Sequence, residues 1–224
     1  MPARLGPDLR LIMLGAGGHA KVLLSLVEAL GLSIQGICDP ALALHGLTNW
    51  RGVPVLGGDE VLSHIDPGSV GLINGIGQTE GKTVRQRLYE KLRTSGFHFP
   101  TLVHPLAWVS TEARIELGTQ IMAGAVVQTD CYIGENCIIN TNSSIDHDTI
   151  IGAHVHVAPG VTLCGSVKVG DGAFIACGAT VIQNVCIGEM AFVGAGVTLV
   201  HDLAARQLVR SMNTSQVKLH RDDY

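Results

Sequence analysis

The sequence predicts two folding units, an α/β domain of about one hundred residues followed by a solenoid of short, stacked parallel strands. Three observations support this prediction. Residues 107–202 divide without a gap into sixteen hexapeptides whose third residue is always aliphatic. Glycine or asparagine recurs every eighteen residues in the same segment. Upstream, an apolar run ends at a glycine-rich turn that opens a helical pattern, as expected for a strand–turn–helix unit.

Strands that alternate with helices predict a parallel sheet with crossover helices for the first unit. The expected elements, in chain order, are a strand at Leu11–Leu14, a helix that ends at Gly31, a strand at Ser33–Cys38, a strand at Val70–Ile76 and an amphipathic helix at Gly81–Thr94.

A glycine-rich turn, Gly15-Ala16-Gly17-Gly18, lies between the first strand and the first helix. Bare backbone N–H groups at a helix N-terminus suit phosphate, and an acid after the second strand, Asp39, can hydrogen-bond a ribose or base. A tight turn without a ligand is the alternative. About one hundred residues are too few for both halves of a dinucleotide fold, so we expect a mononucleotide-sized ligand rather than a nicotinamide cofactor.

The hexapeptides predict a triangular prism, because three strands and three corners recur in every eighteen residues. A helix is excluded, since six is not a helical period and the segment is rich in glycine and β-branched residues. The aliphatic third residues are Val109, Ile115, Ile121, Val127, Ile133, Ile139, Ile145, Ile151, Val157, Leu163, Val169, Ile175, Val181, Ile187, Val193 and Leu199.

Composition narrows the function. Charged residues make up 15% and aromatic residues 4% of the chain, and no basic stripe with interleaved aromatics suggests nucleic-acid binding. No apolar run reaches the length of a membrane span, and no signal peptide precedes the first strand. The six cysteines lack CxxC spacing, which favours packing roles in a reducing cytoplasm. The histidines offer no metal-ligand set.

One polar cluster, residues 140–148, lies within the solenoid and contains His147 between two aspartates. Histidine titrates near neutrality and can take a proton from an attacking amine or hydroxyl, while a neighbouring carboxylate fixes its tautomer. A solvated Asp-His-Asp corner is the alternative, and the spacing leaves both open. Strict alternation from Ile145 turns His147 inward, so a catalytic role requires the corner to redirect it outward.

Two motifs together resemble a known family. GAGGHAKV at residues 15–22, with Asp39 after the second strand, and NTNSSIDHDTIIGAHVHVAPG at residues 140–160 are similar to the sugar acetyltransferases of the bacterial sialic-acid and bacillosamine type. The resemblance implies a Rossmann-like N-terminal domain followed by a left-handed parallel β-helix, a hexapeptide-repeat solenoid. It also implies homotrimers with active sites in clefts between neighbouring prisms.

The resemblance assigns roles to individual residues. It implies that His147 is the general base and Asp148 the acid that supports it, where the bacillosamine-type enzymes have glutamate. Asn140 matches a residue lining the acceptor pocket. The positions matching acetyl-CoA contacts are His156, Gly165, Cys177 and Ala195. The positions matching loops that hold the nucleotide of the sugar nucleotide are Gly15, Gly17, Gly18, His19, Asp39 and Gly57 or Gly58.

Two departures from the family pattern affect these expectations. Pro40 replaces a second acid after Asp39, which leaves the choice of nucleotide open. Residues 209–214 replace the Gly-x-Pro-Ala-Lys turn with which the family usually ends its β-helix. We expect the basic residues of this tail to supply charge for the 3′-phosphate and pyrophosphate of the coenzyme.

The sequence therefore predicts a Rossmann-like domain at residues 1–103, a β-helix at 104–202 and a tail at 203–224. The expected function is acetyl-CoA-dependent N-acetylation of a nucleotide-linked amino sugar by a cytoplasmic homotrimer without a metal. An O-acetyltransferase of a free sugar such as sialic acid and a non-catalytic trimeric scaffold are the alternatives. The sequence fixes neither the nucleotide nor the ring position of the amine.

Overall fold

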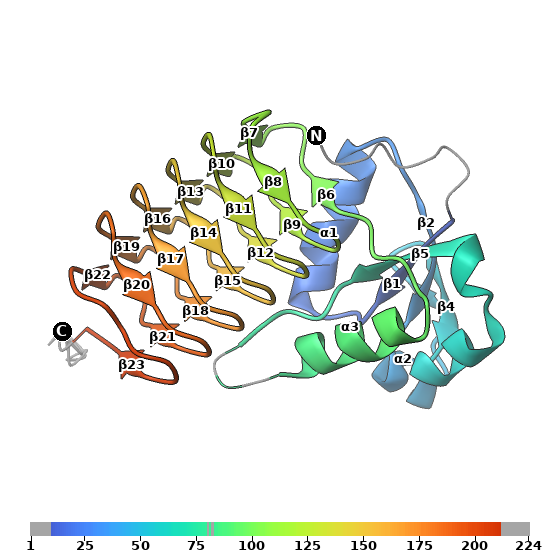
Figure 1. Cartoon of the computed structure of the whole chain (residues 1–224). Helices are drawn as coiled ribbons and strands as arrows, with labels where there is room; N and C mark the ends of the chain where they lie inside the picture. Colours follow the sequence, from blue (N-terminus) through green and yellow to red (C-terminus); the bar gives the residue numbers. More distant parts are fainter. Residues whose placement is uncertain (1–9, 80, 82, 212–224) are drawn as a thin grey trace, which may run out of the picture.

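The computed structural model of the protein describes residues 10–79, 81 and 83–211, and contains an α/β domain packed against one end of a β-helix (Figure 1). The α/β domain consists of β1 (Arg10–Leu14), α1 (Gly18–Ala29), β2 (Ile34–Cys38), α2 (Pro40–Leu44), β3 (Asn49–Trp50), β4 (Val53–Gly57), 3₁₀ turns at Asp59–His64 and Pro67–Ser69, β5 (Val70–Asn74) and α3 (Val84–Thr94).

The sheet of this domain has the strand order β3-β4-β2-β1-β5, and all its pairs are parallel except β3 with β4. From β1 the chain moves to one side for β2 and β4 and to the other side for β5. The order therefore reverses at β1, and ligands of open α/β sheets bind beyond the carboxyl ends of the strands at such a point. The glycine-rich turn after β1 and the loop after β5 lie there.

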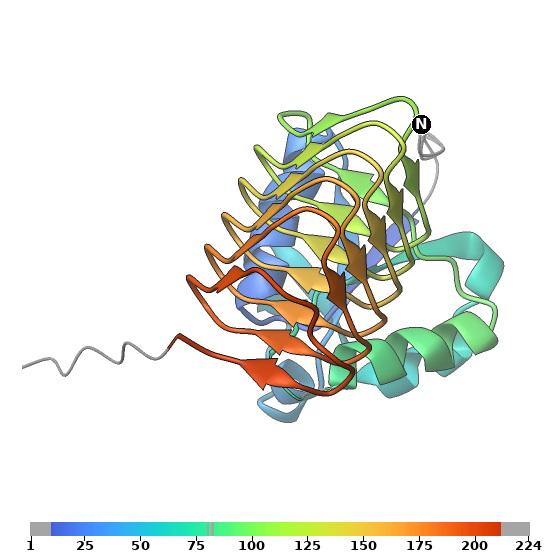
Figure 2. The same ribbon diagram turned by 60° about the vertical axis from the view of Figure 1, so that its left-hand side comes forward.

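The remainder of the chain forms a parallel β-helix with three flat faces, whose triangular coils are seen nearly end-on in Figure 2. The β12 face contains β6 (Leu102–Val103), β9 (Gln120–Ile121), β12 (Ile138–Ile139), β15 (His156–Val157), β18 (Phe174–Ile175), β21 (Phe192–Val193) and β23 (Leu208–Val209). The β13 face contains β7 (Trp108–Val109), β10 (Val126–Val127), β13 (Ser144–Ile145), β16 (Thr162–Leu163), β19 (Thr180–Val181) and β22 (Thr198–Leu199). The β14 face contains β8 (Arg114–Ile115), β11 (Tyr132–Ile133), β14 (Ile150–Ile151), β17 (Lys168–Val169) and β20 (Cys186–Ile187).

The hexapeptide pattern explains this architecture residue by residue. The aliphatic third residues from Ile121 onwards are buried and form one continuous core. The sixth residue of each hexapeptide from 118 to 196 has a positive φ, so each corner turns through one left-handed residue. Glycine is needed for a second reason at Gly134, where a Cβ would lie 2.6 Å from the backbone carbon of Gly152 in the next coil. The predicted fold class, an α/β domain followed by a left-handed β-helix, is confirmed.

The structure also differs from the sequence prediction at several points. Strand pairing begins earlier than residue 107 and continues beyond residue 202, because β6 pairs with β9 and β23 pairs with β21. The first part of the expected tail therefore still follows the coil, while residues 212–224 lie outside the described residues. The α/β domain contains α2, β3 and β4, which the sequence did not predict, and α3 begins at Val84 rather than at residue 81.

The α/β domain packs on the β12 face near the start of the β-helix. Met122 and Ile138 of the β-helix share a hydrophobic core with Leu11, Met13 and the apolar side of α1. In Figure 1, α1 lies between the β-sheet of the α/β domain and the first coils. The two domains consequently share a buried interface, which places the glycine-rich turn against the β-helix.

Candidate active site

His147 and Asp148 form a hydrogen-bonded pair on the corner between β13 and β14. Nδ1 of His147 lies 2.7 Å from Oδ2 of Asp148, and the two side chains are 55% and 59% exposed. A carboxylate only accepts, so Nδ1 carries the proton and Nε2 of the neutral ring is left as a lone pair. The hydrogen bond to Asp148, together with nearby Asp146, raises the pKa of His147 above its usual value.

The corner redirects His147 outward, as a catalytic role requires. Asp148 is the left-handed residue of its corner, with φ of 57°, so strand alternation ends before His147. The backbone N–H of His147 donates to Oδ1 of Asp146 at 2.8 Å, which fixes the turn. Asp148 therefore has two roles here, since it shapes the corner and partners the imidazole.

Gly165 lies one coil further on, against the ring of His147. A Cβ at position 165 would be 2.6 Å from Cε1 and 2.7 Å from Nε2 of His147, closer than real contacts allow. The Gly165 carbonyl accepts from Asn184 at 3.1 Å, but its N–H donates no hydrogen bond within the described residues. The residue that packs on the imidazole thus has an N–H that is free to donate.

Asn140 and His156 meet on the β12 face. Oδ1 of Asn140 accepts from the backbone N–H of Thr141 at 2.8 Å, so Nδ2 of Asn140 faces Nε2 of His156 at 3.2 Å. His156 is buried, and burial and the nearby charge of Arg85 lower its pKa to about 4. This histidine is neutral at physiological pH and accepts through Nε2.

The expected nucleotide loops come together at the strand-order reversal. Gly15 has φ of 82°, and Gly17 and Gly18 have open space where a side chain would be. Both carboxylate oxygens of Asp39 are engaged, because Oδ2 accepts from the N–H of Ala16 at 2.8 Å and Oδ1 from that of Leu42 at 2.9 Å. Asp39 therefore holds the glycine turn in place, besides any contact with a ribose or base.

His19 is the point of contact between these loops and the β-helix. Its Nε2 lies 2.8 Å from Oε1 of Gln120, and Arg85 donates to the same oxygen at 3.3 Å. Burial and Arg85 lower the pKa of His19 to about 3. Sequence reasoning missed Gln120 and Arg85, because one looks like an outward hexapeptide residue and the other like the charged side of a helix.

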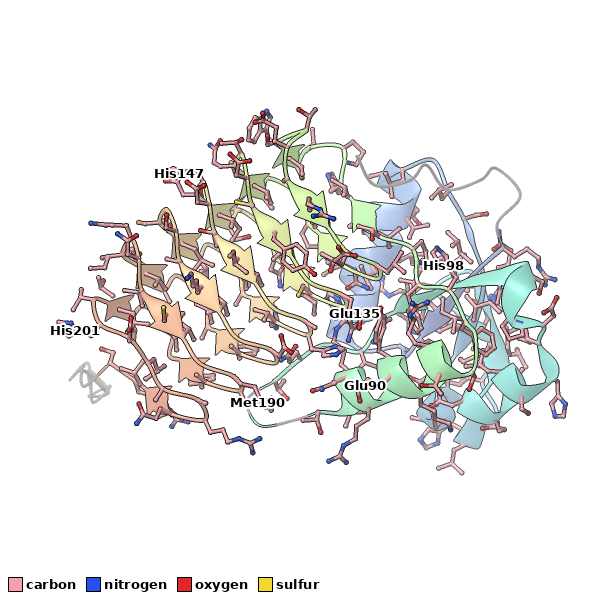
Figure 3. The ribbon with its side chains drawn as sticks, in the orientation of Figure 1. Glu90, His98, Glu135, His147, Met190 and His201 are labelled. Atoms are coloured by element: carbon pink, nitrogen blue, oxygen red, sulfur yellow. The ribbon has the colours of Figure 1, made fainter. Side chains whose placement is uncertain are left out.

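The predicted site residues fall into three groups on one chain. The glycine turn, Asp39 and Gly57 form one group, in which the oxygen of Gly57 accepts from the N–H of Asp39. This group lies on the side of the β12 face, where His19 contacts Gln120, and Asn140 and His156 pair on the same face. Cys177 and Ala195 are exposed on the corners between the β12 and β13 faces. His147, Asp148 and Gly165 lie on the β13–β14 edge, which is opposite the β12 face in a triangular coil (Figure 2). In Figure 3, His147 accordingly lies at the far edge from Glu90 and Glu135.

Cavities and ion sites add little to this arrangement. A groove of about 600 Å³ on the β14 face is lined by Ile150, Lys168 and Cys186, and none of the predicted site residues lines it. Within the described residues no cluster of three or more histidine, cysteine or acidic side chains is placed to hold a metal. No helix there is both long enough and apolar enough to span a membrane.

Two family models match the chain. The PglD N-terminal domain model matches residues 10–92, and the bacterial transferase hexapeptide model (six repeats) matches residues 112–147 and 130–165. Both matches agree with the division into an α/β domain and a β-helix.

Solved structures of similar proteins cover nearly the whole chain. PerB from Caulobacter crescentus, in complex with CoA and GDP-perosamine, is 36% identical, with a TM-score of 0.81 over 92% of this chain and 95% of that one. The acetyltransferase domain of PglB from Neisseria gonorrhoeae FA1090, in complex with acetyl coenzyme A, is 31% identical, with a TM-score of 0.83 over 90% of this chain and 95% of that one.

Curated proteins match over shorter segments. The GDP-perosamine N-acetyltransferase of Escherichia coli O157:H7 is 32% identical over 90 residues, which are 40% of this chain and 41% of that protein. The bifunctional protein GlmU of Pelobacter propionicus is 33% identical over 76 residues, 16% of its length. The chain thus spans less than half the length of these curated relatives.

Proposed function

Because this chain belongs to the sugar acetyltransferases of the hexapeptide-repeat superfamily, with a PglD-type N-terminal domain, we propose that it transfers the acetyl group of acetyl-CoA to the amine of a nucleotide-linked amino sugar. The observation that carries this proposal is the His147–Asp148 pair, whose imidazole packs against Gly165, a residue with an N–H that donates no hydrogen bond within the described residues. GDP is the nucleotide we favour, since PerB was solved with GDP-perosamine.

The pair supplies the base that the reaction needs. The neutral sugar amine attacks the thioester carbonyl, and the nitrogen of the tetrahedral intermediate becomes cationic. Nε2 of His147 takes that proton, while Asp148 stabilises the resulting imidazolium through the Nδ1 hydrogen bond. Collapse of the intermediate expels the thiolate of CoA, which receives the proton from His147, so the products are the sugar amide and free CoA.

The N–H of Gly165 is our candidate for stabilising the oxyanion of this intermediate. It has no competing acceptor in the described residues, and it belongs to the coil directly next to His147. An oxyanion donor is most effective when it is already in place before charge develops. The rigid corner around Gly165, whose carbonyl is hydrogen-bonded to Asn184, supports this role.

The nucleotide half of the substrate fits the crevice beyond β1 and β5. The open backbone at Gly17 and Gly18, at the N-terminus of α1, suits a diphosphate. Asn140 lies on the same side of the β-helix and offers its amide to the sugar. His156 is a neutral neighbour of Asn140 and introduces no charge close to the acceptor amine.

The separation of the two half-sites supports a homotrimer. In one chain the crevice faces the β12 face, whereas His147 lies on the opposite edge, so one chain does not bring the amine to its own base. We propose that the His147 edge of one subunit faces the crevice of the next around a threefold axis. Exposed Cys177 and Ala195 then line the cleft for acetyl-CoA, in a soluble cytoplasmic enzyme.

The test is a thiol-release assay with acetyl-CoA and a panel of GDP-, UDP- and dTDP-linked amino sugars, with free sialic acid as a further acceptor. We expect amide formation on a nucleotide-linked amine, and a His147→Ala variant that folds normally but loses about 10²–10⁴-fold in kcat/KM. Acetylation of the free sugar alone, or a His147→Ala variant as active as the wild type, would refute the proposal.

A further inference from the structure

Arg85 of α3 is a fully buried cation with no carboxylate at ion-pair distance in the part of the chain that the structure describes. Its side chain is 2% exposed, and its Nε has no hydrogen-bond partner. All four of its acceptors, the backbone oxygens of Asn74, Ile76 and Asn136 and the amide oxygen of Gln120, are uncharged. Burying such a charge costs free energy even when it is hydrogen-bonded, and an apolar side chain often stabilises such a position more. The fold alone therefore does not explain the arginine at this position.

Two hydrogen bonds of Arg85 hold one wall of the nucleotide crevice. Nη1 donates to the carbonyl oxygen of Asn74 at 2.7 Å and to that of Ile76 at 2.8 Å. Between these residues, Gly75 packs so closely against the turn after β1 that a Cβ would lie 3.0 Å from the oxygen of Gly15. Arg85 thus fixes the loop after β5 against the glycine-rich turn.

A further hydrogen bond of Arg85 determines how Gln120 faces His19. Nη2 of Arg85 donates to Oε1 of Gln120 at 3.3 Å, while Nε2 of Gln120 donates to the oxygen of Asn74 at 3.0 Å. These two bonds leave Gln120 no freedom to turn its amide over. Oε1 is an acceptor, so Nε2 of His19, 2.8 Å away, must carry a proton and donate.

The other ring nitrogen of His19 follows from this assignment. With the proton on Nε2, Nδ1 of the neutral ring is a lone-pair acceptor, and no described residue donates to it. His19 is the second residue of α1, directly after the open glycines. An acceptor is therefore available at the crevice where the proposed nucleotide-linked sugar, with its hydroxyl and amine donors, binds.

We propose that Arg85 is a positioning residue, which acts through Gln120 to hold His19 as a neutral Nε2–H imidazole whose Nδ1 accepts a hydrogen bond from the nucleotide-linked sugar. The identity of this ligand rests on the proposed function, whereas the state of His19 does not. Lysine is a poor substitute, since one ammonium does not match the four acceptor oxygens that surround the planar guanidinium.

Electrostatics agree with this geometry. The titratable groups that act on His19 are Arg85 from α3 and His156 from β15, and both disfavour its protonation, as does burial. The pKa of His19 is lowered to about 3, so the ring stays neutral over the working pH range. A neutral ring keeps its acceptor and does not repel an ammonium on the sugar.

The direct test reads the ring nitrogens of His19 by ¹⁵N NMR in the unliganded full-length protein, assigned by comparison with a His19→Gln variant. We expect an Nε2–H tautomer that does not titrate between about pH 5 and pH 8. A ring that carries its proton on Nδ1, or that titrates near the ordinary histidine pKa, overturns the proposal.

Two variants at position 120 then test the relay. Gln120→Leu should release the tautomer of His19 and raise the KM for the nucleotide sugar about tenfold, with the KM for acetyl-CoA unchanged. Gln120→Glu keeps an acceptor but adds a carboxylate, so His19 should become titratable and kcat/KM for the nucleotide sugar should fall as pH decreases. Gln120→Leu with the wild-type tautomer, or Gln120→Glu without a raised pKa of His19, contradicts the relay.

Tyr89→Phe is the matched control at the same interface. It removes the hydrogen bonds from the Tyr89 hydroxyl to Glu135, 2.8 Å long, and to the oxygen of Leu117, 3.4 Å long, and neither acceptor is part of the relay from Arg85 to His19. We expect the His19 spectrum and both KM values of this variant to equal those of the wild type. If the wild type acetylates no nucleotide sugar but its His19 spectrum is as expected, the proposed function fails while the relay stands.

Discussion

Replacing Gly165 with alanine tests whether the position of the His147 ring governs catalysis. The added Cβ would lie 2.6 Å from Cε1 and 2.7 Å from Nε2 of His147. Carbon atoms in contact lie about 3.5–4.0 Å apart, so the ring must move by about 1 Å. His147 is 55% exposed and has room to swing outward, so the fold should tolerate the change.

A displacement of about 1 Å at a reacting group costs about 10²-fold in rate. We therefore expect kcat/KM of Gly165→Ala to fall about 10²-fold with a melting temperature close to that of the wild type. The backbone N–H of residue 165 is kept in this variant, so the loss reports on the imidazole. Gly68→Ala, whose Cβ meets only ordinary contacts, is the control. Wild-type kcat/KM in Gly165→Ala would refute the reasoning.

Four further changes have defined outcomes. Asp148→Asn keeps a residue that tolerates positive φ but removes the charge that raises the pKa of His147. The acidic limb of the pH profile of kcat/KM should therefore move to lower pH, and an unmoved limb contradicts this. Gly18→Asp places a carboxylate where phosphate is expected, so steady-state kinetics should show a raised KM for the nucleotide sugar and an unchanged KM for acetyl-CoA. An equal rise of both KM values contradicts a phosphate site at Gly18. Gly134→Ala should destabilise the fold by about 1–3 kcal/mol in denaturant titrations, because its Cβ meets backbone; an unchanged midpoint rejects this. Deleting residues 212–224, which leaves β23 intact, should raise the KM for acetyl-CoA above all if Lys218 and Arg221 contact the coenzyme phosphates, and a normal KM excludes that contact for these two residues.

The β-helix could be predicted in detail because its rule is local and repetitive. From residue 113 to residue 196, each hexapeptide has an aliphatic third residue and a left-handed sixth residue, and even Met190 and His154 adopt positive φ at that position. After residue 202 the hexapeptide pattern is lost, so the predicted end of the β-helix lies too early. The strand β23 still pairs with β21 beyond that point. In the α/β domain, β3 and β4 were missed because their short runs carry little periodicity, and because β4 depends on pairing with β2, a strand earlier in the chain.

The candidate site shows the same limit. His147 and Asp148 are neighbours in sequence, so their pairing could be expected, and the corner geometry then explains why the ring points outward. The relay from Arg85 to His19 could not be expected, because Gln120 is more than thirty residues from either partner and its burial depends on the docking of two domains. Long-range polar contacts of this kind leave no pattern in a single sequence.

The central claim is that one subunit supplies the base and its neighbour the nucleotide crevice. It is tested most directly by co-expressing His147→Ala and Gly18→Asp subunits, purifying the mixed oligomers and measuring acetyl transfer at a nucleotide-sugar concentration far below the raised KM of Gly18→Asp, where neither parent is active. With random assembly about one quarter of the interfacial sites combine an intact edge with an intact crevice, so activity should return to about that fraction of the wild-type value. Mixed oligomers as inactive as either parent would contradict the shared site.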